Sequence, residues 1–294
     1  ALTIPGRKPV RSRNQLVLDF SRKEVVDGIF GQISAVLDNA NIEYVKWDMN
    51  RSLMDVFSVM TKDQGRVMYD YVLGLYDFLD RMVNRYPDLL IEGCSGGGFD
   101  AGMLYYTPQI WCSDNSDAID RLRIQYGTSF GYPVSAMGAH VSAVPNHQTG
   151  RITPLHTRGV VAMSGTFGYE LDLLKLTEEE KDEVRSQIGE FRKYAPLIQN
   201  GRYYRLTDPF KSEVCAWEIV GNSQEEVLLN VVMEEIHGNM TVNYVQLRGL
   251  DESALYKEQA TGRIYSGAAL MHGGMPLPAE FGEYRAYQYH FVRE

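Results

Sequence analysis

Short apolar runs alternate with stretches of helical periodicity over the first two thirds of the chain. From Lys23 to Asn39 the apolar residues recur at the spacing of one helix face, and residues 64–85 repeat this pattern. Strands alternating with helices are typical of parallel α/β units. In full, the pattern predicts strands at residues 15–19, 44–48, 89–92, 109–111, 132–137 and 160–164 and helices at residues 23–39, 64–85, 117–127 and 177–194.

The last third of the chain has a different pattern. Beyond Cys215, apolar runs are separated by glycine-containing turn signals such as residues 221–222, and a final run covers residues 287–292. Such runs predict a small antiparallel β domain. We therefore expect two domains, an α/β domain at residues 1–200 and a β domain at residues 201–294.

The composition is that of a globular protein with a net negative charge. The 294 residues are 44% apolar and 23% charged, and 38 acidic against 29 basic residues give a net charge of −9. An acidic chain without a basic block disfavours nucleic acid and anionic membranes as partners. Apolar runs stay well short of the roughly 18 residues of a membrane-spanning helix. A neutral sugar remains compatible with this charge.

The three cysteines, Cys94, Cys112 and Cys215, show no paired spacing. This usage is typical of a reducing compartment, so we expect a cytoplasmic protein. The opening residues 1–5 contain no methionine and do not form a signal peptide. We expect a fragment, whose upstream part would carry any targeting signal.

Asp48 ends an apolar run beside a cation and an aromatic ring. Lys46 precedes it by two positions, so both side chains leave the same face of a strand. A nearby ammonium favours the charged form of a carboxyl group, which is the form that a nucleophile needs. The alternative interpretation is a surface Lys/Asp pair at a strand end.

Asp114 follows the next strand but one, in the segment Ser-Asp-Asn-Ser-Asp at residues 113–117. Asp and Ser are the preferred N-cap residues, so this acid has a structural explanation as well. If Ser116 or Asp117 caps the following helix, Asp114 is left for a cleft. Trp111 and Cys112 then offer partly apolar surroundings, which suit a general acid.

The remaining motifs indicate no cofactor. The glycine run at residues 93–98 lacks the Lys-Ser/Thr of a phosphate loop, and its glycines more simply let backbone approach a ligand. No histidine lies near Cys94 in the sequence, and the six histidines show no HExxH or His-x-His spacing. We expect no metal, although His140 and His147 could line a cleft.

In a (β/α)8 barrel, functional residues lie at the C-terminal ends of the strands. Here those ends carry polar, glycine-rich and aromatic residues, including the two aspartates. If two such acids face each other across a cleft, the chemistry that they suit best is glycosidic bond cleavage. The aromatic content of 11% fits stacking on sugar rings, and it fits ordinary core packing equally well.

Six segments together form a specific combination of motifs, which are residues 5–7, 12–19, 44–51, 92–98, 113–119 and 138–148. In this combination the sequence resembles glycoside hydrolase family 36, in particular the bacterial α-galactosidases active on raffinose-type sugars. The resemblance extends over essentially the whole chain.

The resemblance implies a (β/α)8 barrel that lacks roughly its first two strands, followed by a small C-terminal antiparallel β domain. It implies retaining hydrolysis of terminal α-galactosides of the melibiose/raffinose type, with Asp48 as nucleophile and Asp114 as acid/base. The residues expected to touch the galactosyl unit are Arg13, Lys46, Trp47, Cys94 and Gly96. Family members often assemble into tetramers, so we expect a homo-oligomer with a small oligosaccharide substrate and no cofactor.

Two departures from the family pattern stand out. Family members carry a large N-terminal β domain and earlier barrel strands, including an Asp pair that binds the sugar, and these are not in this chain. A Gly-Arg that usually separates the glycine run from Phe-Asp is also missing, so Gly98 is followed directly by Phe99. This deletion concerns the loop near Cys94.

Three alternatives remain open at this point. Within the family, a transglycosylase or an α-N-acetylgalactosaminidase differs from an α-galactosidase by as little as one loop. A non-catalytic sugar-binding fragment is a second alternative, because barrel strands are missing. An unrelated metal-dependent barrel enzyme is a third.

Overall fold

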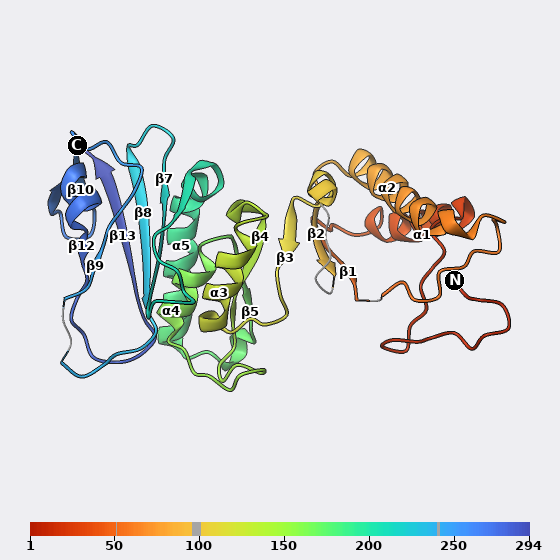
Figure 1. Ribbon diagram of the computed structural model, residues 1–294, viewed down its shortest axis with the longest axis horizontal. Coiled ribbons are helices and arrows are strands. Elements are labelled where there is room, and N and C mark those ends of the chain that lie inside the picture. The colour runs from red at the N-terminus through yellow and green to blue at the C-terminus, as the bar shows by residue number, and fades with distance from the viewer. Residues whose placement is uncertain (51, 96–100, 240–241) are drawn as a thin grey trace. The chain divides into compact units, whose positions relative to one another are not determined.

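The computed structural model describes residues 1–50, 52–95, 101–239 and 242–294 (Figure 1). The chain divides into two compact units, residues 1–111 and residues 112–294. Parallel strands with accompanying helices occur in both units, and the second unit also contains an antiparallel sheet.

The first unit contains two helices and a parallel sheet. Its elements are α1 (Lys23–Leu37), β1 (Tyr44–Met49), α2 (Val67–Arg85), β2 (Leu90–Ser95) and β3 (Gln109–Trp111), with 3-10 turns at Gln64–Arg66 and Ala101–Tyr105. β2 pairs in parallel with both β1 and β3, and α1 packs against α2. The helices and strands predicted at these places are confirmed.

An aromatic cluster holds α2 against β1. Phe78 of α2 is completely buried, and its ring centroid lies 4.9 Å from that of Trp47 in β1. Phe20 and Phe30 pack edge-on against the same ring, at 6.1 and 6.2 Å. Aromatic rings prefer such tilted and edge-to-face contacts, and their burial supplies much of the stability of a core. The cluster therefore fixes the strand that carries Asp48.

The strand predicted at residues 15–19 does not form. Arg13 and Asn14 have positive φ angles of 50° and 58°, and Gln15 makes an isolated bridge to Ser12. The carbonyl of Val17 accepts a hydrogen bond of 2.9 Å from the amide of Leu2. An apolar run becomes a strand where a neighbour completes its backbone hydrogen bonds in register. Here the left-handed turn at Arg13 and Asn14 and these local hydrogen bonds replace the regular pairing with a neighbouring strand.

The second unit opens with helices and two parallel strands. They are α3 (Ala118–Thr128), β4 (Met137–Ser142), α4 (Leu155–Ala162), β5 (Thr166–Glu170) and α5 (Glu178–Asn200). α5 begins with the predicted capping box, in which Thr177 and Glu180 exchange hydrogen bonds of 2.9 and 3.2 Å.

Two strand predictions in this unit are wrong. Residues 160–162 of the predicted strand are the last residues of the helix α4 and residues 163–164 are the turn after it, while the strand expected at residues 132–137 begins only at Met137. Because nearly all of α4 is buried, its apolar residues show no helical periodicity, and a short apolar run cannot be told from a strand.

An antiparallel β domain follows α5. Its six-stranded sheet has the order β11-β10-β13-β8-β7-β6. The strands are β6 (Arg202–Arg205), β7 (Val214–Val220), β8 (Glu226–Met233), β10 (Leu255–Glu258), β11 (Ile264–Ser266) and β13 (Arg285–Arg293). A small second sheet joins β9 (Tyr244–Val245) to β12 (Met275–Pro276), and a π-helical turn covers Ala269–Gly273. The predicted β domain is confirmed as antiparallel, and the boundary predicted at residues 200–201 stays a prediction.

The central strands β7 and β8 of the six-stranded sheet are buried on both faces. α4 lies against β8 and β13 and α5 against β7, as Figure 1 shows, and Trp217 and Ile219 point to this helical face. Ala216 and Val220 pack into the core on the other face. Glu218 lies between them in the strand, and burial raises the pKa of Glu218 to about 8, although the amide of Arg248 donates a 2.6 Å hydrogen bond to it.

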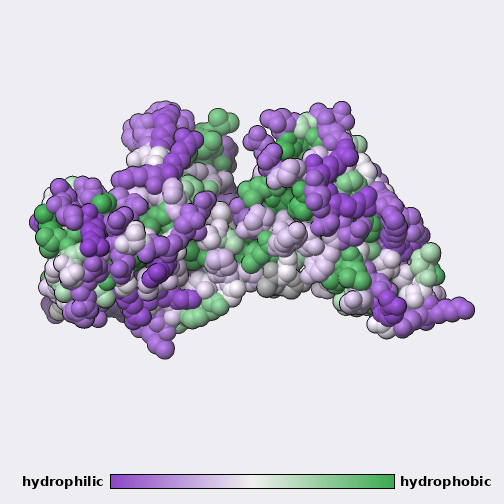
Figure 2. All heavy atoms as spheres, turned by 90° about the horizontal axis from the view of Figure 1, so that it is seen from above, coloured by the Kyte–Doolittle hydropathy of each residue, from purple (hydrophilic) through white to green (hydrophobic). Residues whose placement is uncertain are grey.

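On the face drawn in Figure 2, hydrophilic residues predominate and hydrophobic ones form small patches. In the part of the chain that the structure describes, every helix is too short or too polar to cross a membrane.

Candidate active site

The carboxylate of Asp48 lies at the C-terminal end of β1 beside a cavity. The side chain is exposed, and Asn50 donates a 2.6 Å hydrogen bond to it. The cavity has a volume of about 180 Å³ and lies within the first unit. Its lining residues are Gln15, Leu16, Val17, Leu18, Phe20, Trp47, Asp48, Met49, Asn50, Tyr71 and Leu75. The segment that was predicted as a strand thus forms one wall of a cavity that Asp48 also lines.

Lys46 stands two residues before Asp48 on the same strand. Its Nζ lies 3.7 Å from Oε1 of Glu92 and 4.0 Å from the centroid of the Trp111 ring. Alternation along a strand places Lys46 and Asp48 on one face of the sheet, as predicted. The structure adds Glu92, which sequence reasoning did not single out as a functional residue.

The other predicted sugar contacts are distributed around this strand end. Cys94 of β2 is buried and is the in-register partner of Asp48. Trp47 is half-buried, between its contact with Phe78 and the cavity. Arg13 is exposed in the turn that precedes Gln15. Gly96 lies outside the described residues. The structure therefore places Lys46 and Cys94 on the same face of the sheet as Asp48 and Trp47 on the opposite face, against α2. Their contacts with a sugar stay predictions.

Asp114 lies in the second unit, in the loop before α3. The side chain is exposed, and its backbone carbonyl accepts a 2.9 Å hydrogen bond from Nε2 of Gln148. The N-cap of α3 is Asp117, whose carboxylate accepts the amides of Ile119 and Asp120 at 3.0 and 3.1 Å. The prediction that a neighbouring residue caps this helix is confirmed. Asp114 is therefore not needed for the cap, and its pairing with Asp48 stays a prediction.

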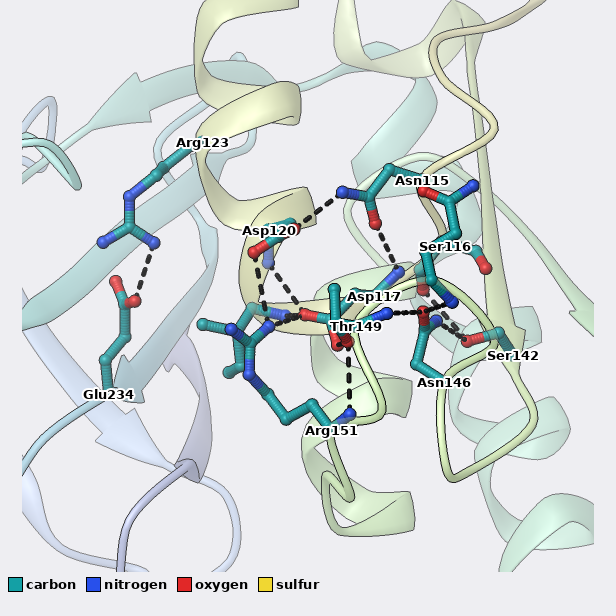
Figure 3. A network of polar contacts seen from close by, with 12 residues as sticks. Asn115, Ser116, Asp117, Asp120, Arg123, Ser142, Asn146, Thr149, Arg151 and Glu234 are labelled. Atoms are coloured by element: carbon teal, nitrogen blue, oxygen red, sulfur yellow. Dashed lines mark hydrogen bonds and ion pairs between the residues drawn. The ribbon is translucent and has the colours of Figure 1, made fainter.

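A polar network clamps the loop that carries Asp114 (Figure 3). The side chains of Arg151 and Thr149 converge on Asp117, with a Thr149–Asp117 hydrogen bond of 2.8 Å and an Arg151–Asp117 ion pair. Arg151 also contacts Asp120 at 3.3 Å. Ser142, at the end of β4, donates a 3.0 Å hydrogen bond to the carbonyl of Ser116. These partners come from β4 and from the loop after it. The loop that carries Asp114 is therefore held in place by a segment that is distant from it in the sequence.

The partners in this network were missed from the sequence. Asn146 is buried, and its side-chain oxygen accepts the amides of Gln148 and Thr149 at 2.9 and 3.2 Å. An asparagine that accepts the amide two residues on forms an Asx turn, so Asn146, with Pro145 and Gly150 beside it, was an available signal for a tight loop here.

We expect Arg151→Met to destabilise the second unit by about 2–4 kcal/mol, because Asp117 would be left buried without its cation. The measurement is urea denaturation of the variant and of wild type. Arg185→Met is the matched control, since its ion pair with Asp182 is exposed and should contribute less than about 0.5 kcal/mol. Equal unfolding midpoints for Arg151→Met and wild type would show that the ion pair of Arg151 with Asp117 does not stabilise the fold.

The histidines and possible metal ligands lie elsewhere in the second unit. His140 of β4 is partly buried, with Nδ1 3.8 Å from Oε2 of Glu170, and His147 is exposed. That either lines a cleft stays a prediction. Within the described residues, Glu213, Glu235 and His237 form one exposed group whose ligand atoms lie within 4.8 Å of one another. Nε2 of His237 is already paired with Glu213 at 2.8 Å.

Known families and proteins match this chain over nearly its whole length. Residues 1–201 match the melibiase family, and residues 214–291 match the glycosyl hydrolase family 36 C-terminal domain. The chain is 62% identical over 294 residues to the bifunctional alpha-galactosidase/sucrose kinase AgaSK of Mediterraneibacter gnavus, covering 99% of this chain and 31% of that protein. It is 50% identical over 292 residues to alpha-galactosidase Mel36A of Lactobacillus acidophilus, covering 98% of this chain and 40% of that protein.

Solved structures agree with these matches. The galactosidase domain of AgaSK superimposes with a TM-score of 0.96 at 61% identity, covering all of this chain and 40% of that one. The family 36 α-galactosidase AgaA from Geobacillus stearothermophilus also gives 0.96, at 46% identity, covering all of this chain and 41% of that one. The chain thus spans roughly a third to two fifths of the length of these relatives.

The structural match confirms the predicted fold class, which is part of a (β/α)8 barrel followed by a small antiparallel β domain. The melibiase match includes both Asp48 and Asp114. On the family matches and the identities together, this chain belongs to the melibiases of glycoside hydrolase family 36.

Proposed function

We propose that this chain is the catalytic part of a retaining α-galactosidase that acts on terminal α-galactosides of the melibiose/raffinose type. The observation that carries the proposal is the carboxylate of Asp48, which is exposed at a strand end in a chain of this family, with Lys46 on the same face of the strand. Relatives named alpha-galactosidase support it, as do crystal structures of AgaA variants in complex with raffinose and with stachyose.

The proposed reaction is a double displacement. Asp48 attacks the anomeric carbon while Asp114 protonates the oxygen of the leaving group, and a galactosyl–Asp48 ester forms. Asp114 then takes a proton from water, which attacks the ester and releases galactose with retained configuration. This division of labour requires the two carboxyl groups to lie about 5–5.5 Å apart in the working enzyme.

The remaining residues hold the sugar. Lys46, Cys94 and Arg13, with Gly96, would contact the galactosyl hydroxyls, and the Trp47 ring would lie beside the sugar. An ammonium and a guanidinium supply donors for hydroxyl oxygens, and an aromatic face suits the apolar face of a pyranose. Homo-oligomer formation and a cytoplasmic location stay predictions from the sequence.

The test is an assay with nitrophenyl α-galactoside, in which NMR identifies the anomer of the first product. Initial release of α-galactose supports the proposal, whereas β-galactose would replace retention with inversion. The N-acetylated analogue and added sucrose test for α-N-acetylgalactosaminidase and transglycosylase activity. Galactose binding without turnover, by calorimetry on the same preparation, would indicate a sugar-binding chain that is not an enzyme.

A further inference from the structure

Glu92 of β2 is a completely buried carboxylate close to the candidate site. Strand register places it between Lys46 of β1 and Gln109 of β3. In-register residues of parallel strands project from the same face of the sheet. One oxygen, Oε2, accepts a hydrogen bond from Nε2 of Gln109, and the other, Oε1, lies 3.7 Å from Nζ of Lys46.

The burial of Glu92 makes its pairing with Lys46 energetically important. A carboxylate removed from water is costly unless a cation and hydrogen bonds compensate the lost hydration. Among the described side chains, Gln109 contacts this carboxylate through a hydrogen bond and Lys46 through an ion pair, so Lys46 supplies the positive charge. Removal of the Lys46 charge therefore leaves the Glu92 carboxylate buried without a cation.

The same pairing restricts Lys46. Lysine carries its charge on a flexible four-carbon stem, so an exposed ammonium samples many positions. Here the ammonium is held by the carboxylate at 3.7 Å and by the face of the Trp111 ring at 4.0 Å, while the side chain keeps 34% of its surface exposed. An ammonium has three donors, so donors remain for a ligand on the exposed side.

The next position on the same face of the sheet carries the candidate nucleophile. Asp48 follows Lys46 by two residues, and its in-register partner is Cys94, two residues after Glu92. We propose that Glu92 is a positioning residue, which holds the ammonium of Lys46 where it can bind a hydroxyl of the sugar that Asp48 attacks. The inference rests on the proposed function and names a residue that acts only through Lys46.

The first test is a double-mutant cycle in the intact protein, read by steady-state kinetics. Glu92→Gln keeps the shape of the side chain and should raise KM for nitrophenyl α-galactoside about tenfold, with kcat changed less than about threefold. Lys46→Met should raise KM further. The double variant should lose no more than Lys46→Met alone, because Glu92 has no route to the substrate except Lys46.

The matched control is Glu218→Gln, which replaces another completely buried carboxylate, in the β domain. It should leave KM unchanged. A wild-type KM in Glu92→Gln would overturn the proposal, and so would a double variant whose loss equals the product of the two single losses.

The second test does not depend on Glu92→Gln being well folded. Lys46→Met leaves the Glu92 carboxylate buried without its cation, so the melting temperature should fall by more than about 5 °C. Lys62→Met, at an exposed lysine of the same unit, should melt close to wild type. If Lys46→Met melts as wild type does, the ion pair holds neither partner and the proposal is wrong.

The two tests separate this inference from the proposed function. A wild-type protein that turns over no α-galactoside overturns the function and with it the sugar-binding role of Lys46, whatever the melting temperatures. Normal turnover with additive kinetic losses overturns the positioning role of Glu92 alone.

Discussion

Asp48→Ala is expected to lower turnover of α-galactosides by at least about 10⁴-fold, because no other group would form the covalent intermediate. The exposed carboxylate lies beside the cavity and makes its 2.6 Å contact with Asn50, so its removal should leave the fold intact. The measurement is kcat for nitrophenyl α-galactoside, with circular dichroism to verify folding.

Azide makes this experiment specific. In Asp48→Ala the small anion fits the space of the lost carboxylate and attacks the anomeric carbon from the same side, so the product should be β-galactosyl azide. Asp77→Ala is the control, since Asp77 is an exposed residue of α2 in the same unit. Retention of wild-type turnover by Asp48→Ala would remove the nucleophile assignment.

Asp114→Asn is expected to show a loss that depends on the leaving group. A general acid contributes about 10²–10⁴-fold, so hydrolysis of raffinose should fall within this range. A nitrophenolate leaves with little help from an acid, so formation of the galactosyl–enzyme from nitrophenyl α-galactoside should fall far less. Its breakdown, which needs Asp114 as base, becomes slow, and a burst of nitrophenol is expected.

Azide should also act on Asp114→Asn, with the opposite product. Here it attacks the galactosyl–Asp48 ester without the help of a base, so the product should be α-galactosyl azide and the steady-state rate should rise. Asp182→Asn, an exposed substitution in α5 of the same unit, should behave as wild type. Equal losses on both substrates, with no effect of azide, would contradict an acid/base role for Asp114.

The elements that could be predicted from the sequence are those with a long or self-contained local signal. α1 and α2 have apolar faces at helical spacing, and α5 has in addition the capping box of Thr177 and Glu180. The wrong predictions concern short apolar runs. Residues 160–162 end a buried helix, and residues 15–18 line a cavity, because the surroundings rather than the local pattern decide the conformation of a short apolar run.

In the candidate site, too, some features could be predicted from the sequence and others could not. The strand ends could be located from the sequence because the change from apolar to polar residues is local, and this located both Asp48 and Asp114. The capping role of Asp117 followed from its position at a helix start. The clamp of Arg151 on Asp117 could not be predicted, since the two residues are 34 positions apart and many acids and bases could have paired.

The sequence by itself therefore determined the long helices, the antiparallel β domain and the family, because helical periodicity, helix caps and strand-end motifs each lie in neighbouring residues, and the catalytic roles of the two aspartates stay predictions. Only the tertiary structure decided which side chains support them. Parallel register places Glu92 beside Lys46, and the loop after β4 brings Arg151 to the base of α3. Both ion pairs depend on how distant segments of the chain pack. Burial makes each pair energetically important, because a carboxylate removed from water needs a nearby cation.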